Sequence, residues 1–265
     1  MRLLILVVWA VYLTEALVRW RAGGWVFKGY RPGALRPVEG ADVELLDGRV
    51  GLVLLPLFPW EFAFRAAGED WTTGPTRARL ADVERAVVPV GIAATLLFGC
   101  LLPVPTALIF SGHLLPLLWP WLIASGIAWA ATLLLFFTTY RRVHDAWPSA
   151  ETTAMALLSP LALTRAPFWI QGPAIEAAHP LAAAAVLCDD RVFSRLARRW
   201  QFDHPEDAER VAALAAERGI APGSLTAAPA LQPDLTKFCP RCHQGYVEAA
   251  AVCADCGGVE LAALR

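Results

Sequence analysis

Charged side chains are scarce in this sequence, and several catalytic motifs are absent from it. These absences limit the classes of function that the protein can have. Asp, Glu, Lys and Arg together make up 18% of the residues, and the formal net charge is −1. A chain this close to neutrality has no overall electrostatic attraction for nucleic acid or for acidic substrates. The sequence also lacks a G-x-S-x-G elbow, a P-loop, a dinucleotide-binding glycine motif and an H-E-x-x-H zinc site. These absences exclude the most common signatures of hydrolases, nucleotide-binding enzymes and zinc proteases.

Hydrophobic residues are abundant and lie in long runs. They account for 57% of the chain, and the mean hydropathy is +0.47, above the balance of ordinary soluble domains. The runs cover residues 3–18, 86–110 and 114–138, and the last two contain no charged side chain. A bilayer core of ~30 Å requires about 20 helical residues. Residues 86–139 therefore predict a transmembrane helical hairpin.

Residues 1–20 predict an N-terminal transmembrane anchor. A cleaved signal peptide is the alternative for this stretch. It requires a cleavage site of small residues after the apolar run, and Thr14-Glu15-Ala16 is a poor one. We therefore favour the uncleaved anchor.

Cationic residues predict the orientation in the membrane. They follow the first run, precede the hairpin and follow it again, at Arg19, Arg21, Lys28, Arg31, Arg36, Arg77, Arg79, Arg85, Arg141 and Arg142. The hairpin tip, residues 111–113, has no Lys or Arg. Because cationic flanks stay in the cytoplasm, the pattern predicts a protein of the bacterial inner membrane with its N-terminus outside. The bulk of the chain and the C-terminus are then cytoplasmic.

The remaining segments predict smaller elements. Residues 21–85 predict a β-rich cytoplasmic insert, because Asp47-Gly48 is a hairpin-turn signal between apolar strands. Residues 140–222 predict a cytoplasmic or interfacial helical region, since prolines interrupt its apolar stretches. A linker, residues 223–236, precedes the C-terminal tail.

A basic helix is expected within the helical region. Its cations are Arg191, Arg195, Arg198 and Arg199. Such a helix contacts either an anionic lipid surface or nucleic acid. Beside the predicted spans, contact with the lipid bilayer is favoured over nucleic acid.

The C-terminal tail, residues 237–262, contains four of the six cysteines. Cys239 and Cys242 form one Cys-x-x-Cys pair, and Cys253 and Cys256 form a second, with ten residues between the pairs. This spacing lets four thiolates surround one tetrahedral zinc ion, in a closed shell that leaves no position for a substrate. The segment is too short to bury a sufficient core, so a structural Zn²⁺ would supply much of its folding free energy.

The segment 238–261 resembles the small zinc ribbons of bacterial proteins, especially those of the C-terminal CPxC…CxDCG type. The matching positions are Cys239, Pro240, Cys242, Tyr246, Cys253, Asp255, Cys256, Gly257 and Leu261. The resemblance covers about a tenth of the chain and implies the ribbon fold and zinc binding. It does not imply an activity, because such ribbons serve as nucleic-acid binders, protein-docking modules or structural braces. His243 departs from the pattern, since glycine commonly follows the first pair.

His243 also makes the first pair match Cys-x-x-Cys-His, the attachment motif of c-type haem. Haem attachment would leave Cys253 and Cys256 without a role and would require a tail outside the cytoplasm. Zinc is therefore favoured over haem, over rubredoxin-like iron and over a redox-active dithiol.

Together the patterns predict a mainly α membrane protein with an N-terminal anchor, a transmembrane hairpin, a β-rich insert, cytoplasmic helices and a zinc ribbon. The leading hypothesis is a non-enzymatic protein whose ribbon docks a protein partner or helps to assemble a membrane complex; a homo-oligomer is compatible with it. One alternative is a membrane-interface enzyme with its site in residues 140–200. Its candidate residues are His144, Asp145, Glu176, His179 and Asp189. The other is an electron-transfer protein with haem or iron at the cysteine pairs.

Overall fold

The computed structural model of the protein describes residues 2–15, 17–21, 25–31, 33–38, 43–45, 50–54, 59–227, 235–247, 249–254, 256 and 258–264. The chain divides into two compact units, Met1–Ala183 and Ala184–Arg265. Within the described ranges it is mostly helical and carries small antiparallel sheets. The prediction of a mainly α chain with a minor β component is therefore confirmed.

The first unit begins with a helix, α1 (Arg2–Glu15), after which short strands form two sheets. The strands are β1 (Leu17–Arg21), β2 (Trp25–Gly29), β3 (Arg36–Val38), β4 (Val43–Leu45), β5 (Val50–Leu54) and β6 (Phe62–Ala66). One sheet has the order β1-β5-β4 and the other the order β3-β2-β6, with antiparallel pairing throughout. The β-rich character expected of the insert is thus present. Its predicted turn at Asp47-Gly48 lies outside the described residues.

Helix α1 is shorter than the anchor predicted over residues 1–20. It ends at Glu15, and β1 follows at once and pairs with β5. Its 14 residues cover about 21 Å, less than the ~30 Å of a hydrocarbon core. Val18 and Trp20 favour extended structure, which agrees with a strand at this place. A transmembrane role for α1 remains a prediction.

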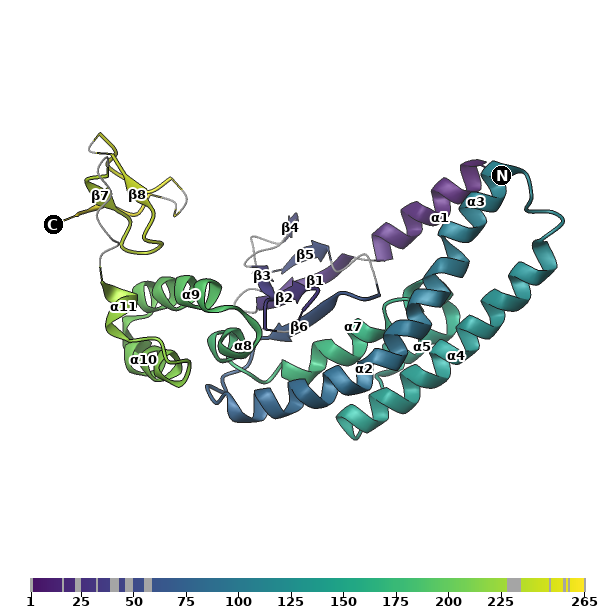
Figure 1. The fold of residues 1–265 in the computed structure, drawn as a ribbon, viewed down its shortest axis with the longest axis horizontal. Helices are drawn as coiled ribbons and strands as arrows, with labels where there is room; N and C mark the ends of the chain where they lie inside the picture. Colours follow the sequence, from purple (N-terminus) through teal and green to yellow (C-terminus); the bar gives the residue numbers. More distant parts are fainter. Residues whose placement is uncertain are drawn as a thin grey trace. The chain divides into compact units, whose positions relative to one another are not determined.

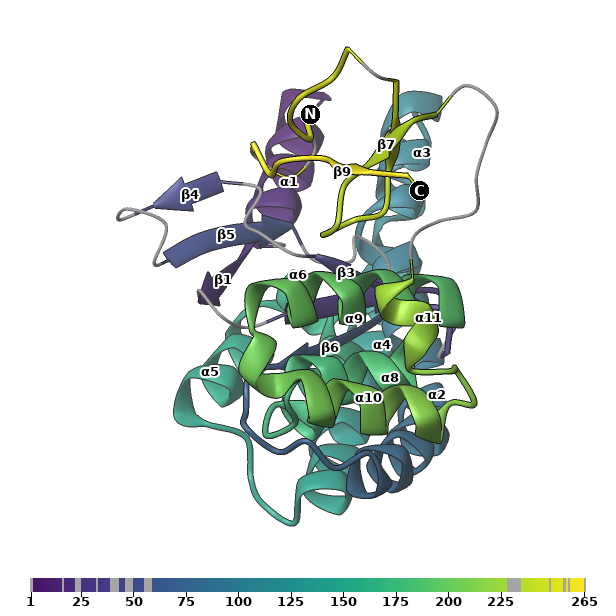
Figure 2. The same cartoon turned by 90° about the vertical axis from the view of Figure 1, so that its left-hand side faces the viewer.

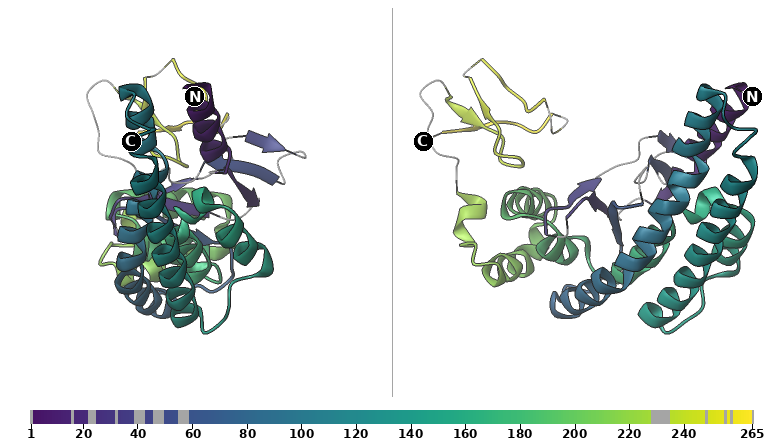
Figure 3. Two further views of the ribbon diagram at one scale, coloured as in Figure 1. Left: turned by 90° about the vertical axis from the view of Figure 1, so that its right-hand side faces the viewer. Right: turned by 45° about the vertical axis from the view of Figure 1, so that its right-hand side comes forward.

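Two long helical segments follow and run side by side (Figures 1 and 3). The first joins α2 (Gly74–Leu101) to α3 (Pro103–Ser111), and the second is α4 (Leu118–His144). The break at Leu102 precedes prolines, which cannot donate to the preceding turn. Gly112 ends α3 in the left-handed conformation, with φ of 76°. The segments contain 38 and 27 residues and are long and apolar enough to cross a membrane.

The outer faces of these helices are apolar and exposed. On α2, Val88, Ile92 and Leu96 are 56–62% exposed, whereas Val83, Val90 and Leu97 are buried on its inner face. The most apolar window of α4 is only 17% buried. Its exposed side chains include Trp119, Ile123, Ile127 and Leu134. The core helix of a soluble protein would bury such a surface.

Helix α1 packs against this hairpin. Trp9 Nε1 donates to Thr106 Oγ1 at 3.2 Å, and Tyr12 is buried against Phe98. Arg165 donates to the backbone carbonyl of Tyr12, and its guanidinium carbon lies 4.2 Å from the Tyr12 ring centroid. These contacts make α1 part of the first unit's core.

Short helices complete the first unit: α5 (Ala150–Leu158), α6 (Pro160–Leu163), α7 (Ala166–Gln171) and the 3₁₀ helix η1 (Gly172–Ile175). Gln171 ties them to the sheet, because its Oε1 accepts the backbone N–H of Ala63 at 2.8 Å. Gly68 permits a close approach, since a Cβ there would lie 1.9 Å from the Ala177 carbonyl oxygen. These elements hold β6 against the hairpin.

The second unit combines helices with the cysteine-rich tail. Its elements are the end of α8 (Pro180–Leu187), then α9 (Asp190–Asp203), η2 (Pro205–Asp207), α10 (Ala208–Glu217), α11 (Gly223–Thr226), β7 (Lys237–Phe238), β8 (Gly245–Tyr246) and β9 (Ala262–Ala263). Helices α10 and α11 both pack against α9 (Figure 2). Asp189 caps α9 by accepting the Val192 N–H at 2.8 Å. Helix α11 lies inside the predicted linker 223–236, of which residues 228–234 lie outside the described part.

Candidate metal centre

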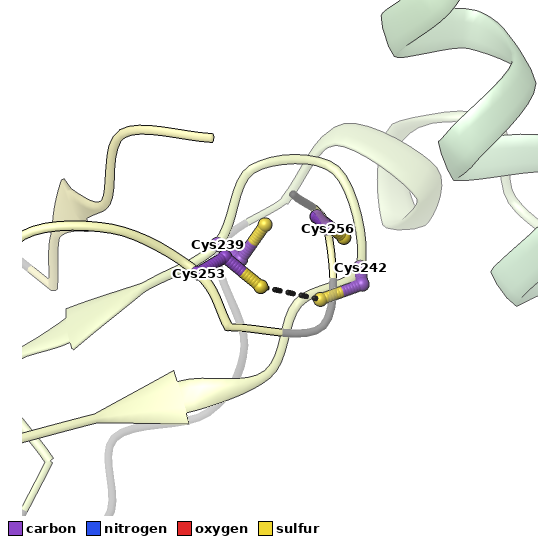
Figure 4. A group of neighbouring side chains, drawn as sticks. All are labelled: Cys239, Cys242, Cys253 and Cys256. Carbon is purple, nitrogen blue, oxygen red and sulfur yellow. Dashed lines mark hydrogen bonds between the residues drawn. The ribbon is translucent and has the colours of Figure 1, made fainter. Parts of the chain in front are cut away.

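Four cysteine sulfurs converge in the second unit. The Sγ atoms of Cys239, Cys242, Cys253 and Cys256 all lie within 4.8 Å of one another. Figure 4 shows them on two loops, facing a common space, with 3.7 Å between the sulfurs of Cys242 and Cys253. Sulfurs at 2.3 Å from a tetrahedral zinc ion are separated by about 3.8 Å. The predicted gathering of four thiols that can hold one metal ion is therefore confirmed.

Backbone hydrogen bonds shape the two cysteine loops. In the first loop, Cys239 N–H donates to the Gln244 carbonyl at 2.9 Å, and His243 N–H donates to the Cys239 carbonyl at 2.8 Å. In the second, Gly258 adopts φ of 91° and donates to the Cys253 carbonyl at 3.2 Å. The small sheet, in the order β8-β7-β9, carries the first loop between β7 and β8. Tight turns of this kind place both sulfurs of a pair on one side.

The backbone of His243 explains why glycine is usual at this place. His243 has φ of 60°, in the left-handed region that costs a residue with a Cβ about 1–2 kcal/mol. Its ring meets Phe238 edge-on, with 5.6 Å between centroids, and this contact offsets part of the cost. Burial lowers the pKa of His243, and the charge of Arg198 lowers it further. His243 thus has a packing role beside the cysteines.

Tyr246 contributes to the chemistry of the site. Its hydroxyl oxygen lies 3.1 Å from Cys253 Sγ. Burial opposes ionisation of Cys253, but hydrogen bonds from Tyr246 and from neighbouring thiols bring its pKa down to about 7. Burial raises the pKa of Cys242 and of Cys256, and neighbouring thiols raise that of Cys256 further. Four adjacent thiols ionise together only when a cation balances their charge.

Two arginines supply a further test of whether the site fits a metal. Arg241 lies within the first cysteine loop, and its Nη2 is 2.5 Å from Oδ2 of Asp203, the last residue of α9. The Nε of Arg198 on α9 is buried and has no hydrogen-bond partner among the described residues. Cys242 is close enough to Arg198 to affect its pKa. Zinc with four thiolates is an anion of charge −2, which suits a buried guanidinium. The donor set and its surroundings therefore fit such a centre.

Sequence reasoning missed this arrangement around the cysteines. It assigned Arg198 to a basic surface that contacts lipid, together with its neighbours on the same helix. It gave no role to Asp203 or Arg241. The only signal in the sequence was that Arg198 and Asp203 are separated by five positions near the end of one helix, which does not reveal a contact 38 residues away. The pairing of α9 with the ribbon is a tertiary contact.

The residues proposed for an interfacial enzyme have separate local contacts. His144 Nε2 lies 2.9 Å from the Ile170 carbonyl, and Asp145 ends α4 in the left-handed conformation. The His179 ring stacks on Trp71 at 3.6 Å, while Asp189 caps α9 in the other unit. Glu176 donates its N–H to the Pro173 carbonyl and thus closes a turn. In the described part of the chain, these residues form no cluster with metal-binding geometry.

An apolar groove of about 380 Å³ lies between α2 and the turn before β6. Trp60, Val88, Ile92 and Leu96 line it, with Gln171 as a polar wall. The hydropathy pattern gives no sign of it, because it arises from the packing of a turn on a distant helix.

Comparison with protein-family models, curated proteins and solved structures found no match to the chain. The function proposed below therefore rests on the chemistry of the cysteine site and on the surfaces of the two units.

Proposed function

We propose that this is a non-enzymatic membrane protein whose zinc ribbon docks a protein partner or helps to assemble a membrane complex. The closed set of four cysteine sulfurs carries the proposal. Four thiolates fill the tetrahedral shell of zinc, so the metal has no open position at which a substrate could bind. A metal held in this way stabilises the fold of the ribbon, and the surface of the ribbon can then bind a protein partner.

The exposed apolar faces of α2 and α4 support the membrane part of the proposal. Helix α4 is about 40 Å long, enough for a ~30 Å hydrocarbon core. Its exposed Ile123, Ile127 and Leu134 are side chains that lipid solvates and water does not. Arg141 and Arg142 lie in its last turn, as expected at a cytoplasmic boundary. We place the protein in the bacterial inner membrane with the N-terminus outside and the ribbon in the cytoplasm.

Two exposed valines on the ribbon support the docking part. Val247 is 55% and Val252 is 49% exposed, and both belong to a module of about 26 residues. Exposed apolar side chains of this kind offer positions at which a protein partner could pack against the ribbon. They lie outside the four cysteines, so they can be changed without removing a metal ligand.

The docking proposal is tested with these valines. The full-length protein and its Val247→Asp/Val252→Asp variant are crosslinked in native membranes and purified, and the crosslinked proteins are identified. We expect one set of partners that the wild-type protein captures and the variant loses, while both retain zinc. The proposal fails if no crosslink depends on the valines and the purified protein instead binds nucleic acid tightly.

The topology is tested separately with single cysteines introduced into a background that keeps the four ribbon cysteines. Gly112→Cys at the hairpin tip should react with a membrane-impermeant maleimide in intact cells. Ser224→Cys, between the hairpin and the ribbon, should react only after the cells are opened. The reverse pattern contradicts the orientation.

A further inference from the structure

The arginines of α9 do not share one environment. Arg191 and Arg195 are exposed, whereas Arg198 is half-buried. The Nε of Arg198 is buried and lacks a hydrogen-bond acceptor within the described ranges. A guanidinium donor removed from water without an acceptor is unfavourable, so an acceptor beside this Nε would be stabilising, and an anionic one most of all.

The cysteine ribbon supplies the groups that face Arg198. Burial lowers the pKa of Arg198, while Cys242 opposes this effect and Arg195 adds to it. Arg198 therefore lies beside the first cysteine loop rather than on the open basic face of its helix.

A second contact connects the same loop to the end of α9. Arg241 Nη2 and Nε lie 2.5 Å and 3.1 Å from the same Asp203 oxygen. This ion pair places the loop over the last turn of α9, and Arg241 also lies beside Cys256. Arg198 has no carboxylate partner of this kind at its buried Nε. Neutral thiols are weak acceptors and offer no charge to a guanidinium, so an interaction of Arg198 with the cysteines would depend on ionised sulfurs.

We propose that Arg198 donates to the thiolates of the metal centre and balances part of their charge, so that metal binding clamps the ribbon onto α9. The inference rests on the proposed zinc site and adds a residue to it from outside the ribbon. Groups that orient and neutralise metal ligands in this way commonly affect metal affinity about 10–100-fold. Loss of the metal then removes the acceptor of Arg198 and leaves the Arg241–Asp203 ion pair as the remaining link.

The test uses the full-length protein in detergent. Zinc affinity is measured by competition with a chromophoric chelator for the wild type, Arg198→Ala, Arg198→Lys and the control Arg191→Ala. We expect affinity about 10-fold lower for Arg198→Ala, partial recovery for Arg198→Lys and no change for Arg191→Ala. Equal affinities for Arg198→Ala and the wild type overturn the proposal. So does an equal loss in Arg191→Ala.

A second readout follows the clamp itself. Hydrogen exchange of the backbone amides of residues 196–203 is measured with zinc and after chelation. Exchange should accelerate on chelation in the wild type, and it should already be faster in zinc-bound Arg198→Ala. An exchange rate that does not change on chelation would overturn the proposed clamp. If the wild type binds no metal at all, the zinc site fails, which is a different result from zinc bound without help from Arg198.

Discussion

The helical hairpin and the cysteine ribbon reach order by opposite means. The hairpin has long helices whose buried side chains are apolar and whose outer faces are apolar as well. The ribbon has two-residue strands and few buried side chains apart from its cysteines. The order of the hairpin can therefore depend on the solvent around its helices, and the order of the ribbon can depend on its metal ion. One sequence can contain both regions because the residues that order each of them lie within its own stretch of chain.

The sharpest way to separate the two regions is to remove a metal ligand. Cys253→Ser should abolish stable zinc binding and unfold the ribbon, since structural zinc supplies about 10–16 kcal/mol in comparable modules. The helices should remain. Metal content and backbone hydrogen exchange of residues 237–262 measure the loss, and far-ultraviolet circular dichroism follows the helices. The matched control is Cys100→Ala on α2, which should retain zinc; loss of zinc in both variants would contradict the assignment.

A charge on the hairpin tests the other region. Ile127 is 65% exposed, so Ile127→Lys would be harmless if α4 faced water. In a bilayer, a lysine near the centre of a helix costs about 2.5–3.5 kcal/mol of insertion free energy. We expect less protein in the membrane fraction and more degradation or aggregation, with Glu151→Lys on α5 as the harmless control. A soluble, well-folded Ile127→Lys protein would argue against a membrane span.

Acid should release the metal, and the hydroxyl of Tyr246 should affect the midpoint pH of this release. The pKa of the Cys253 thiol lies below its ordinary value even before a metal binds, because Tyr246 and neighbouring thiols hydrogen-bond to it. Its thiolate therefore contributes stability that is present at high pH and lost as the pH falls, and bound zinc moves this loss to lower pH. Tyr246→Phe removes a hydrogen bond to this thiolate, worth about 1 kcal/mol. The midpoint of zinc release in a pH titration should therefore move upward by about half a unit. A downward shift would contradict the role given to the hydroxyl.

The smallest effect is expected at His243. His243→Gly relieves the left-handed backbone but loses the contact with Phe238, so the ribbon's stability should change by about 1 kcal/mol or less. Zinc binding, followed by chelator competition, should remain. If the substitution abolished a coloured cofactor, the histidine would be a haem ligand and the zinc assignment would be wrong.

The elements predicted well are those whose signal lies within one stretch of sequence. Two charge-free runs were enough to predict the helical pair, and two Cys-x-x-Cys pairs were enough to predict the sulfur cluster. The helices extend beyond the predicted 86–139, starting at Gly74 and ending at His144, because polar residues continue a helix past its apolar part. Hydropathy marks the apolar part alone.

The elements predicted poorly depend on distant partners. Leu17 and Val18 still belong to the apolar run, yet residues 17–21 leave the helix because β5 offers them a ladder of hydrogen bonds. Arg198 looks like its exposed neighbours until the ribbon is placed beside it. Strand pairing and the neutralisation of a buried charge are both set by residues far away in sequence, and no local pattern encodes them.

The most direct test of the account is the metal content of the full-length protein, purified from membranes without added metal. Elemental analysis and a visible absorption spectrum are recorded on the same sample. We expect a colourless protein with about one zinc ion per chain, lost in Cys253→Ser. A protein free of metal, or one that absorbs visible light through iron or haem, would contradict it.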